Sequence, residues 1–229
     1  MAKNSNPSLD KVGRRNTVIL FLCIIIVFIT IILILTMPFI RARFDHDYRI
    51  VKDIPAPTQN DTNGGTALSG QDWTGIATYR AEYDIQGLVI NATEYNSGSI
   101  YDQITPLDIG FAWGDAAANN HLIKWVQGYR HVTASINALS KLYLNQDLNT
   151  IFQQYSNNHL VFKDEELLQK ARTVKLGDYI RIKGYLIDIT AYRDKEPAVK
   201  YKIKTSLTRY DDGEDSCEII LVTSLEAID

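Results

Sequence analysis

The stretch GDYIRIKGYLIDI, residues 177–189, decides which kind of fold this sequence specifies. Ile180 and Ile182 alternate with Arg181 and Lys183. Successive side chains of a strand point to opposite faces of a sheet, so the alternation predicts a strand with one face on a core and the other in water. Gly184 interrupts the pattern and predicts a bend in this strand.

Further strands are predicted on both sides of this stretch. Downstream, residues 198–208 and 217–225 form two runs separated by charged or Gly-containing turns, and VKYKIK at 199–204 alternates strictly between apolar and basic side chains. Upstream, YRAEYDIQGLVINAT at 79–93 predicts a strand with a bend at Gly87, and residues 125–135 predict another. Residues 147–155 and 163–174 predict two short helices. The expected domain is α+β and mainly antiparallel β.

The N-terminal region contains an uncharged apolar run of 24 residues, 17–40. At about 1.5 Å per residue, this run makes roughly 36 Å of helix, against about 30 Å of membrane hydrocarbon. It offers no small-residue cleavage pattern of the kind that ends a signal peptide. The sequence therefore predicts an N-terminal transmembrane helix joined to the β-rich domain. Four basic residues flank the run on each side, so the charge balance leaves the orientation open, and Arg14 and Arg15 close to its start favour a cytoplasmic N-terminus.

Composition divides the remainder of the chain. Residues 1–16 are polar and read as a disordered cytoplasmic tail, 41–72 as a juxtamembrane segment and flexible linker rich in Pro and Gly, and 73–229 as the soluble domain. The chain after residue 40 carries 20 Lys+Arg against 26 Asp+Glu. A nucleic-acid partner is disfavoured by this negative balance.

Standard catalytic and metal-binding motifs are absent from the sequence. The histidines, His46, His121, His131 and His159, have no zinc-ligand spacing, and neither a Walker loop nor GxSxG occurs. Cys23 and Cys217 are not expected to form a disulfide, because one lies in the predicted membrane segment. Five acids surround Cys217, which disfavours a reactive thiolate and favours a small buried side chain. No cofactor, metal or catalytic residue is predicted.

The motif SNNHL, residues 156–160, is the most notable polar run. We expect Asn157, Asn158 and His159 to cap the preceding helix and fix a loop. The alternative is a hydrogen-bond network around the single imidazole, the setting that a hydrolase-type enzyme would use.

Basic side chains define a candidate ligand-binding face. If the strands around residues 179–183 and 199–204 pair, their basic residues share one face of the sheet. Such a face suits an anionic or sugar-like polymer. The residues concerned are Arg181, Lys183, Lys200, Lys202 and Lys204.

Several motifs together carry a resemblance to a known family. SNNHL, GDYIRIKGYL (177–186), TSLTRYDDGEDSCEIILVTSL (205–225), AEYDIQGLV (81–89) and the pair Trp113-Gly114 resemble a family of uncharacterised bacterial single-pass membrane-anchored proteins. The resemblance covers nearly the whole predicted domain. It implies an inner-membrane location with the domain periplasmic or extracellular, and it implies no activity.

The GDxIxIxGxL pattern also resembles the first strands of small barrels of the oligonucleotide/oligosaccharide-binding (OB) type, with Gly184 at the bend. An OB-like barrel with two short helices is therefore one expected architecture.

The layout leads to three functional hypotheses. The first is a membrane-tethered, non-catalytic binding or assembly module, a subunit of an envelope protein complex. The second is an OB-like domain that binds an anionic or sugar-like polymer through the basic face. The third is a hydrolase-type enzyme centred on His159. The sequence favours a non-catalytic role and leaves the partner and the oligomeric state open.

Overall fold

The computed structural model describes residues 17–32, 53–144, 147–208 and 217–228. The chain divides into two compact units, Met1–Asp47 and Tyr48–Asp229. In the first unit, residues 17–32 form a helix with exposed side chains. In the described part of the chain, no helix combines the length and the apolar character needed to cross a membrane.

The predicted fold class, with its transmembrane helix over 17–40, is therefore wrong. The described helix has 16 residues. At about 1.5 Å per residue, these described residues account for roughly 24 Å of helix, against a hydrocarbon thickness of about 30 Å. Residues 33–40 of the predicted segment and the predicted tail, 1–16, lie outside the described residues.

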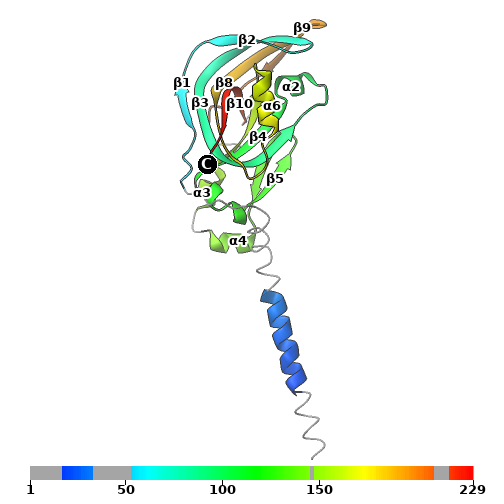
Figure 1. Ribbon diagram of the computed structural model, residues 1–229, viewed down its shortest axis with the longest axis vertical. Coiled ribbons are helices and arrows are strands. Elements are labelled where there is room, and N and C mark those ends of the chain that lie inside the picture. Colours follow the sequence, from blue (N-terminus) through cyan, green and yellow to red (C-terminus); the bar gives the residue numbers. More distant parts are fainter. Residues whose placement is uncertain (1–16, 33–52, 145–146, 209–216, 229) are drawn as a thin grey trace, which may run out of the picture. The chain divides into compact units, whose positions relative to one another are not determined.

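The second unit is built mainly of strands (Figure 1). Its elements in chain order are β1 (Thr58–Asp61), β2 (Gly65–Ser69), β3 (Trp73–Glu94), α2 (Ile100–Ile104), β4 (Leu107–Ala112), α3 (Gly114–Ala118), a 3₁₀ turn (Asn120–Leu122), β5 (Lys124–Gly128), β6 (His131–Ser135), α4 (Ala138–Tyr143), α5 (Leu148–Phe152), β7 (Tyr155–Val161), α6 (Glu165–Arg172), β8 (Tyr179–Arg193), β9 (Glu196–Ile203) and β10 (Glu218–Ala227). The sequence predicted two short helices, and the described chain has more. Helices α5 and α6 lie where those two were expected.

Five of these strands close into a barrel. They pair in the order β3, β4, β7, β10 and β8, and β8 returns to pair with β3. Strands β7 and β10 run parallel, whereas the other neighbours in the ring are antiparallel. Along the chain, helix α6 connects β7 to β8. Figure 1 shows the long curved strands β3 and β8 that form much of the wall. This order of five strands is the connectivity of an OB-type Greek-key barrel.

The barrel interior is filled by alternate side chains of each strand. Leu107, Leu160, Ile220 and Leu186 are opposite one another around the ring, and all four are buried. Their neighbours in sequence point to the outer side of the wall, because strand side chains alternate. On that outer side, α2 contributes to a second apolar cluster with β7, β8 and β10. The polar residues of β4 and β7 lie beside this cluster.

Two regions differ from the sequence prediction. Strands β1 and β2 lie within the predicted linker and pair antiparallel with β3. Their polar, Gly-rich composition gives no strand pattern, yet β3 supplies backbone hydrogen-bond partners, so they need no apolar face. The predicted single strand over 125–135 is a hairpin, in which β5 and β6 meet at a two-residue turn, Tyr129 and Arg130.

The resemblance of GDYIRIKGYL to OB-type barrels predicted that this stretch forms the first barrel strands. The structure instead places it in β8, which is the fourth barrel strand along the chain. There, Gly184 lies against the backbone of β10. The first barrel strand is β3.

Candidate functional site

A polar cluster forms where the β5–β6 hairpin meets the outer wall of the barrel. Its centre is Arg130, whose backbone φ of 56° lies in the left-handed region. Non-glycine residues adopt this conformation uncommonly, so contacts elsewhere have to hold it. The amide of Arg130 donates to the Tyr95 hydroxyl at 3.0 Å, and its carbonyl accepts from Asn157 Nδ2 at 3.2 Å. Both backbone groups of the strained residue are thereby fixed to the barrel.

The guanidinium of Arg130 reaches two buried carboxylates. Nη2 donates to Asp102 Oδ1 at 2.6 Å, and Nη1 lies 3.7 Å from Asp108 Oδ1. Nη1 also donates to Thr105 Oγ1 at 2.8 Å. The side chains of Asp102 and Asp108 are 2% and 0% exposed. Because so little water reaches these charges, each depends on its partner for stabilisation.

Aromatic contact and hydrogen bonds favour the charged forms of this group. The guanidinium carbon of Arg130 lies 4.3 Å from the centre of the Tyr95 ring, a cation–π arrangement. Burial alone would lower the pKa of Arg130, but the hydrogen bond to Asp102 and the charge of Asp108 raise it. Burial would raise the pKa of Asp102, but hydrogen bonds from Ser97 and Arg130 hold it below its usual value. The ion pair therefore stays charged across the neutral range.

The cluster continues along β7 into the SNNHL motif. His159 Nδ1 lies 2.7 Å from Asp108 Oδ1, and Asn157 Nδ2 donates to Asp108 Oδ2 at 3.2 Å. Asn157 Oδ1 in turn accepts from Asn91 Nδ2 at 3.1 Å. These bonds connect neighbouring strands β3, β4 and β7 on their outer faces. Asp108 therefore joins the hairpin, the imidazole and the wall of the barrel.

The motif SNNHL does not cap a helix as expected, because it forms the buried strand β7. Its side chains divide between the two faces. Asn157 and His159 point outward into the cluster, whereas Asn158 points inward and donates to the carbonyl of Ile109 at 3.1 Å. The sequence also left open a hydrogen-bond network around the imidazole. His159 lies in such a network, through its contact with Asp108.

The five predicted basic residues do not share one face. Arg181 and Lys183 lie on the part of β8 that pairs with Gln86 and Asp84 of β3. The lysines of β9 lie beside the far end of β8, where Lys202 is opposite Thr190. Seven residues of strand at about 3.3 Å each separate residues 183 and 190, roughly 23 Å along the strand. The prediction failed because β9 pairs only with the last residues of β8.

The two basic groups also differ in their partners. Arg181 donates from Nε and Nη2 to both carboxylate oxygens of Asp84, at 2.7 and 2.6 Å, and Lys183 Nζ lies 3.9 Å from the same carboxylate. Lys200, Lys202 and Lys204 are exposed on or just after β9, which ends the described order of strands. Lysines on an edge strand hinder pairing with other chains, so their placement has a structural explanation.

Sequence reasoning missed the residues that organise the cluster. Arg130, Asp102, Asp108 and Tyr95 belong to no spacing motif, and the turn at Arg130 lacks the Gly or Asn that marks a hairpin. Among the described residues, no group of three His, Cys, Asp or Glu side chains is placed to hold a metal ion. Cys217 Sγ lies 3.7 Å from the carbonyl of Arg130, at the margin of the same cluster. His46 lies outside the described residues.

Alkaline pH is expected to weaken this cluster through Tyr95. Burial and the charge of Asp108 raise the pKa of Tyr95 from 10.0 to about 12. The unfolded chain then ionises first, so the contribution of Tyr95 to stability is complete below pH 10 and is lost between about pH 10 and 12. Urea denaturation at pH 9 to 12 should show a steeper loss of stability in the parent than in Tyr95→Phe. Equal slopes would contradict the assignment.

The fold and the cluster together define a closed β-barrel with a hairpin clamped to its outer wall by buried ion pairs. Comparison of the chain with family models, curated proteins and solved structures finds no match. The resemblance to bacterial membrane-anchored proteins accordingly stays a prediction.

Proposed function

We propose that the β domain is a non-catalytic binding module that docks a protein partner through its helices α4 and α5, as a subunit of a complex. The observation that carries the proposal is the exposure of large apolar side chains there. Leu142 is 78% exposed, Tyr143 60% and Phe152 39%. Leu142 and Tyr143 are adjacent in α4, and contiguous exposed apolar groups mark interaction surfaces. Aromatic side chains are enriched among the residues that contribute most to protein interfaces.

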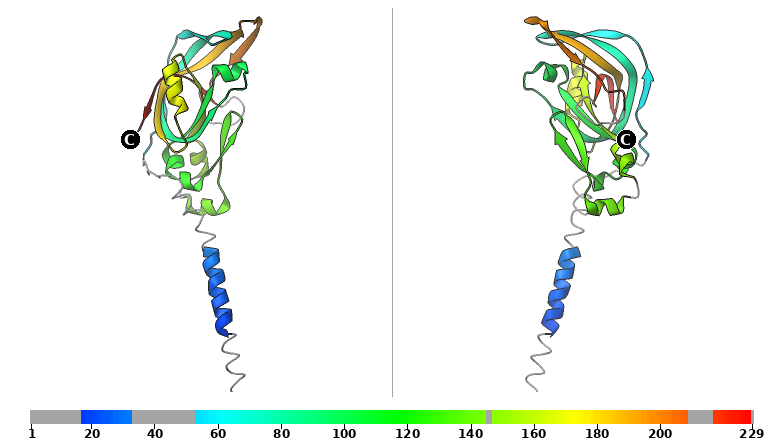
Figure 2. Two further views of the ribbon diagram at one scale, coloured as in Figure 1. Left: turned by 45° about the vertical axis from the view of Figure 1, so that its right-hand side comes forward. Right: turned by 180° about the vertical axis from the view of Figure 1, so that it is seen from behind.

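Local structure holds these side chains in place. Helix α4 begins at the cap Asn137, whose Oδ1 accepts from the amide of Ser140 at 2.8 Å. Asp147 caps α5 in the same way. Figures 1 and 2 place α4 at the end of the β domain opposite to β9 and its lysines. The apolar surface is thus separate from the lysine-bearing edge strand.

The polar cluster supports a non-catalytic role. Arg130, Asp102 and Asp108 are engaged with one another and with the hairpin, so their charges serve to fix the fold. The anionic-polymer hypothesis receives less support, because Asp84 binds Arg181 and the remaining lysines lie elsewhere. The hydrolase hypothesis rests on His159 alone, beside a carboxylate that also contacts Arg130.

The test compares the partners of the parent chain with those of a surface variant. Cross-linking of the full-length protein in its native cells, followed by mass spectrometry, should give cross-links from α4 and α5 to one stoichiometric protein. Leu142→Glu should reduce recovery of that protein at least tenfold, because a charge would be buried without a partner. Leu176→Glu is the matched control, since Leu176 is 58% exposed in a loop before β8. Equal recovery with both variants would overturn the proposal.

A further inference from the structure

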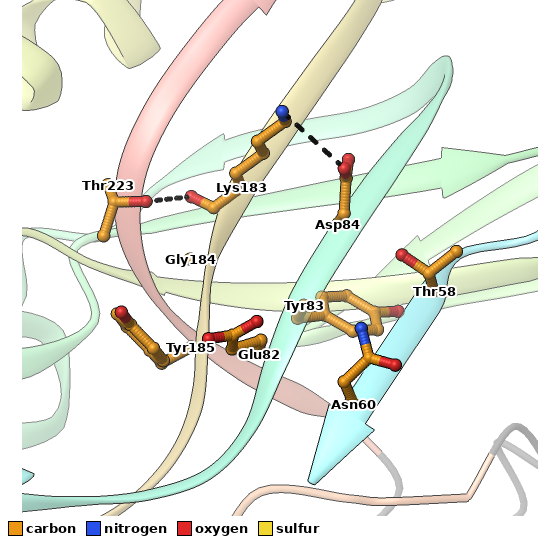
Figure 3. A pocket seen from close by; sticks show the side chains of 9 residues that line it. All are labelled: Thr58, Asn60, Glu82, Tyr83, Asp84, Lys183, Gly184, Tyr185 and Thr223. Atoms are coloured by element: carbon orange, nitrogen blue, oxygen red, sulfur yellow. Dashed lines mark hydrogen bonds and ion pairs between the residues drawn. The ribbon is translucent and has the colours of Figure 1, made fainter. Parts of the chain in front are cut away.

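A hollow lies on the outer wall of the barrel, apart from both the polar cluster and α4. It has a volume of about 260 Å³ and is lined from β1, β3, β8 and β10 (Figure 3). Drug-sized ligands occupy roughly 300–1,000 Å³, so this space suits a smaller molecule. The lining residues are Thr58, Asn60, Glu82, Tyr83, Asp84, Lys183, Gly184, Tyr185 and Thr223.

The strand register arranges the lining in two rows. Asn60 is opposite Glu82, which is opposite Tyr185. In the next row, Thr58 is opposite Asp84, which is opposite Lys183. Directly opposite residues lie about 5 Å apart, so each row of three extends over roughly 10 Å. The rows hold polar groups at a spacing that matches the width of one or two sugar rings.

An irregularity in β10 completes the wall of the hollow. The pairing of β10 with β8 shifts between Val222 and Ser224, which leaves Thr223 as the extra residue. The Thr223 hydroxyl donates to the carbonyl of Lys183 at 3.1 Å, and Figure 3 shows this bond at the edge of the hollow. Bulges of this kind redirect side chains and occur often beside functional sites.

The charges around the hollow balance. Asp84 accepts two hydrogen bonds from Arg181, and Lys183 lies 3.9 Å from the same carboxylate. The hydrogen bond and the charge of Arg181 keep the pKa of Asp84 below its usual value. The lining thus carries two carboxylates, Glu82 and Asp84, and one basic residue, Lys183, while Arg181 neutralises Asp84 from outside the lining. A strongly charged ligand of either sign would therefore meet a repelling partner, which favours a neutral one.

The remaining groups combine hydrogen-bonding capacity with an aromatic surface. Glu82 offers acceptors, Asn60 offers both donors and acceptors, and Thr58 offers a hydroxyl. The Tyr185 ring is held by stacking on Tyr79, with ring centres 4.3 Å apart and planes 7° apart. A sugar presents hydroxyls that donate and accept together with apolar C–H faces that lie against an aromatic ring. This combination of groups fits a sugar better than a purely apolar or purely ionic ligand.

We infer that this hollow is a binding site for a neutral, hydroxyl-rich ligand of the sugar class. Carboxylate and amide side chains of Glu82 and Asn60 would hold its hydroxyls, and Tyr185 would face its ring. The site is independent of the proposed α4–α5 docking surface, because it uses β1, β3, β8 and β10.

The inference is tested by titrating the full-length chain with maltotriose, N,N′,N″-triacetylchitotriose, polyphosphate and free glutamate, with isothermal calorimetry and NMR as the readouts. A saturable response to a neutral trisaccharide at millimolar concentration or below is expected, with none to polyphosphate or glutamate. Glu82→Gln should weaken the binding about tenfold or more, since it removes hydrogen bonds to a charged acceptor. Glu196→Gln, an exposed carboxylate on β9, is the matched control and should leave affinity unchanged.

Three outcomes would overturn the inference. They are no saturable response to either trisaccharide, preferential binding of polyphosphate or glutamate, and unchanged trisaccharide affinity in Glu82→Gln. Leu142→Glu should bind the trisaccharide like the parent, so loss of the protein partner and loss of the sugar are separable results.

Discussion

Replacement of Arg130 by alanine is expected to lower the free energy of unfolding by about 3–5 kcal/mol. The change removes the partner of Asp102 and Asp108, whose side chains are 2% and 0% exposed. A carboxylate left buried without its cation loses its main stabilisation. Alanine would also retain the strain of a φ of 56°. Urea denaturation at pH 7, followed by circular dichroism, measures the effect.

Two further variants separate the causes. Arg130→Gly should be about 1 kcal/mol more stable than Arg130→Ala, because glycine adopts a positive φ without steric cost. Arg181→Ala breaks an ion pair on the exposed wall, where the two side chains are 39% and 28% exposed. Its effect should stay within about 1 kcal/mol. If Arg130→Ala cost no more than Arg181→Ala, the hairpin would not depend on the buried ion pairs.

Gly184→Ala is expected to destabilise the barrel by about 3 kcal/mol. A Cβ at this position would lie 2.1 Å from the carbonyl oxygen of Leu221 and 3.1 Å from Ile220 Cγ2. The carbonyl belongs to a paired strand, so relief requires displacement of β10 from β8. Thermal unfolding followed by circular dichroism measures the change.

Gly98 provides the control for this glycine substitution. Nothing lies within 4 Å of a Cβ built there, but its φ is +79°. Gly98→Ala should therefore cost only the backbone strain, about 1–2 kcal/mol. A Gly184→Ala variant no less stable than Gly98→Ala would show that the barrel tolerates separation of β8 and β10.

The alternation of apolar and polar residues in the sequence predicted a strand correctly where one face of that strand meets water. Ile180 and Ile182 alternate with Arg181 and Lys183, and the structure places this segment in β8 with the isoleucines buried. Strand β7 gave no such pattern, because both of its faces are covered. Of its outward side chains, Asn157 is buried and His159 half-buried, and both are hydrogen-bonded. A hydrogen-bonded polar strand cannot be distinguished from a loop by hydropathy.

The polar cluster depends on contacts between residues that are distant in the sequence. Arg130 meets Asp102 across 28 residues, and His159 meets Asp108 across 51. Local rules for turns describe neither contact, and they disfavour the positive φ that these contacts maintain. Strands β1 and β2 were missed for a related reason, since their backbone partners belong to β3 and their own composition is that of a linker. Pairing partners, more than propensity, determine these elements.

The parallel pairing of β7 with β10 has a consequence for folding. Asn158 and Glu218 are opposite each other although 60 residues separate them in the chain. Contacts at such separation form slowly, because a long loop must close before they can stabilise anything. Until residues 218–227 have been synthesised, β7 and β8 each present an unpaired edge. A growing chain thus passes through a stage in which two open edges are available to other chains, and chaperone contact during synthesis would protect them.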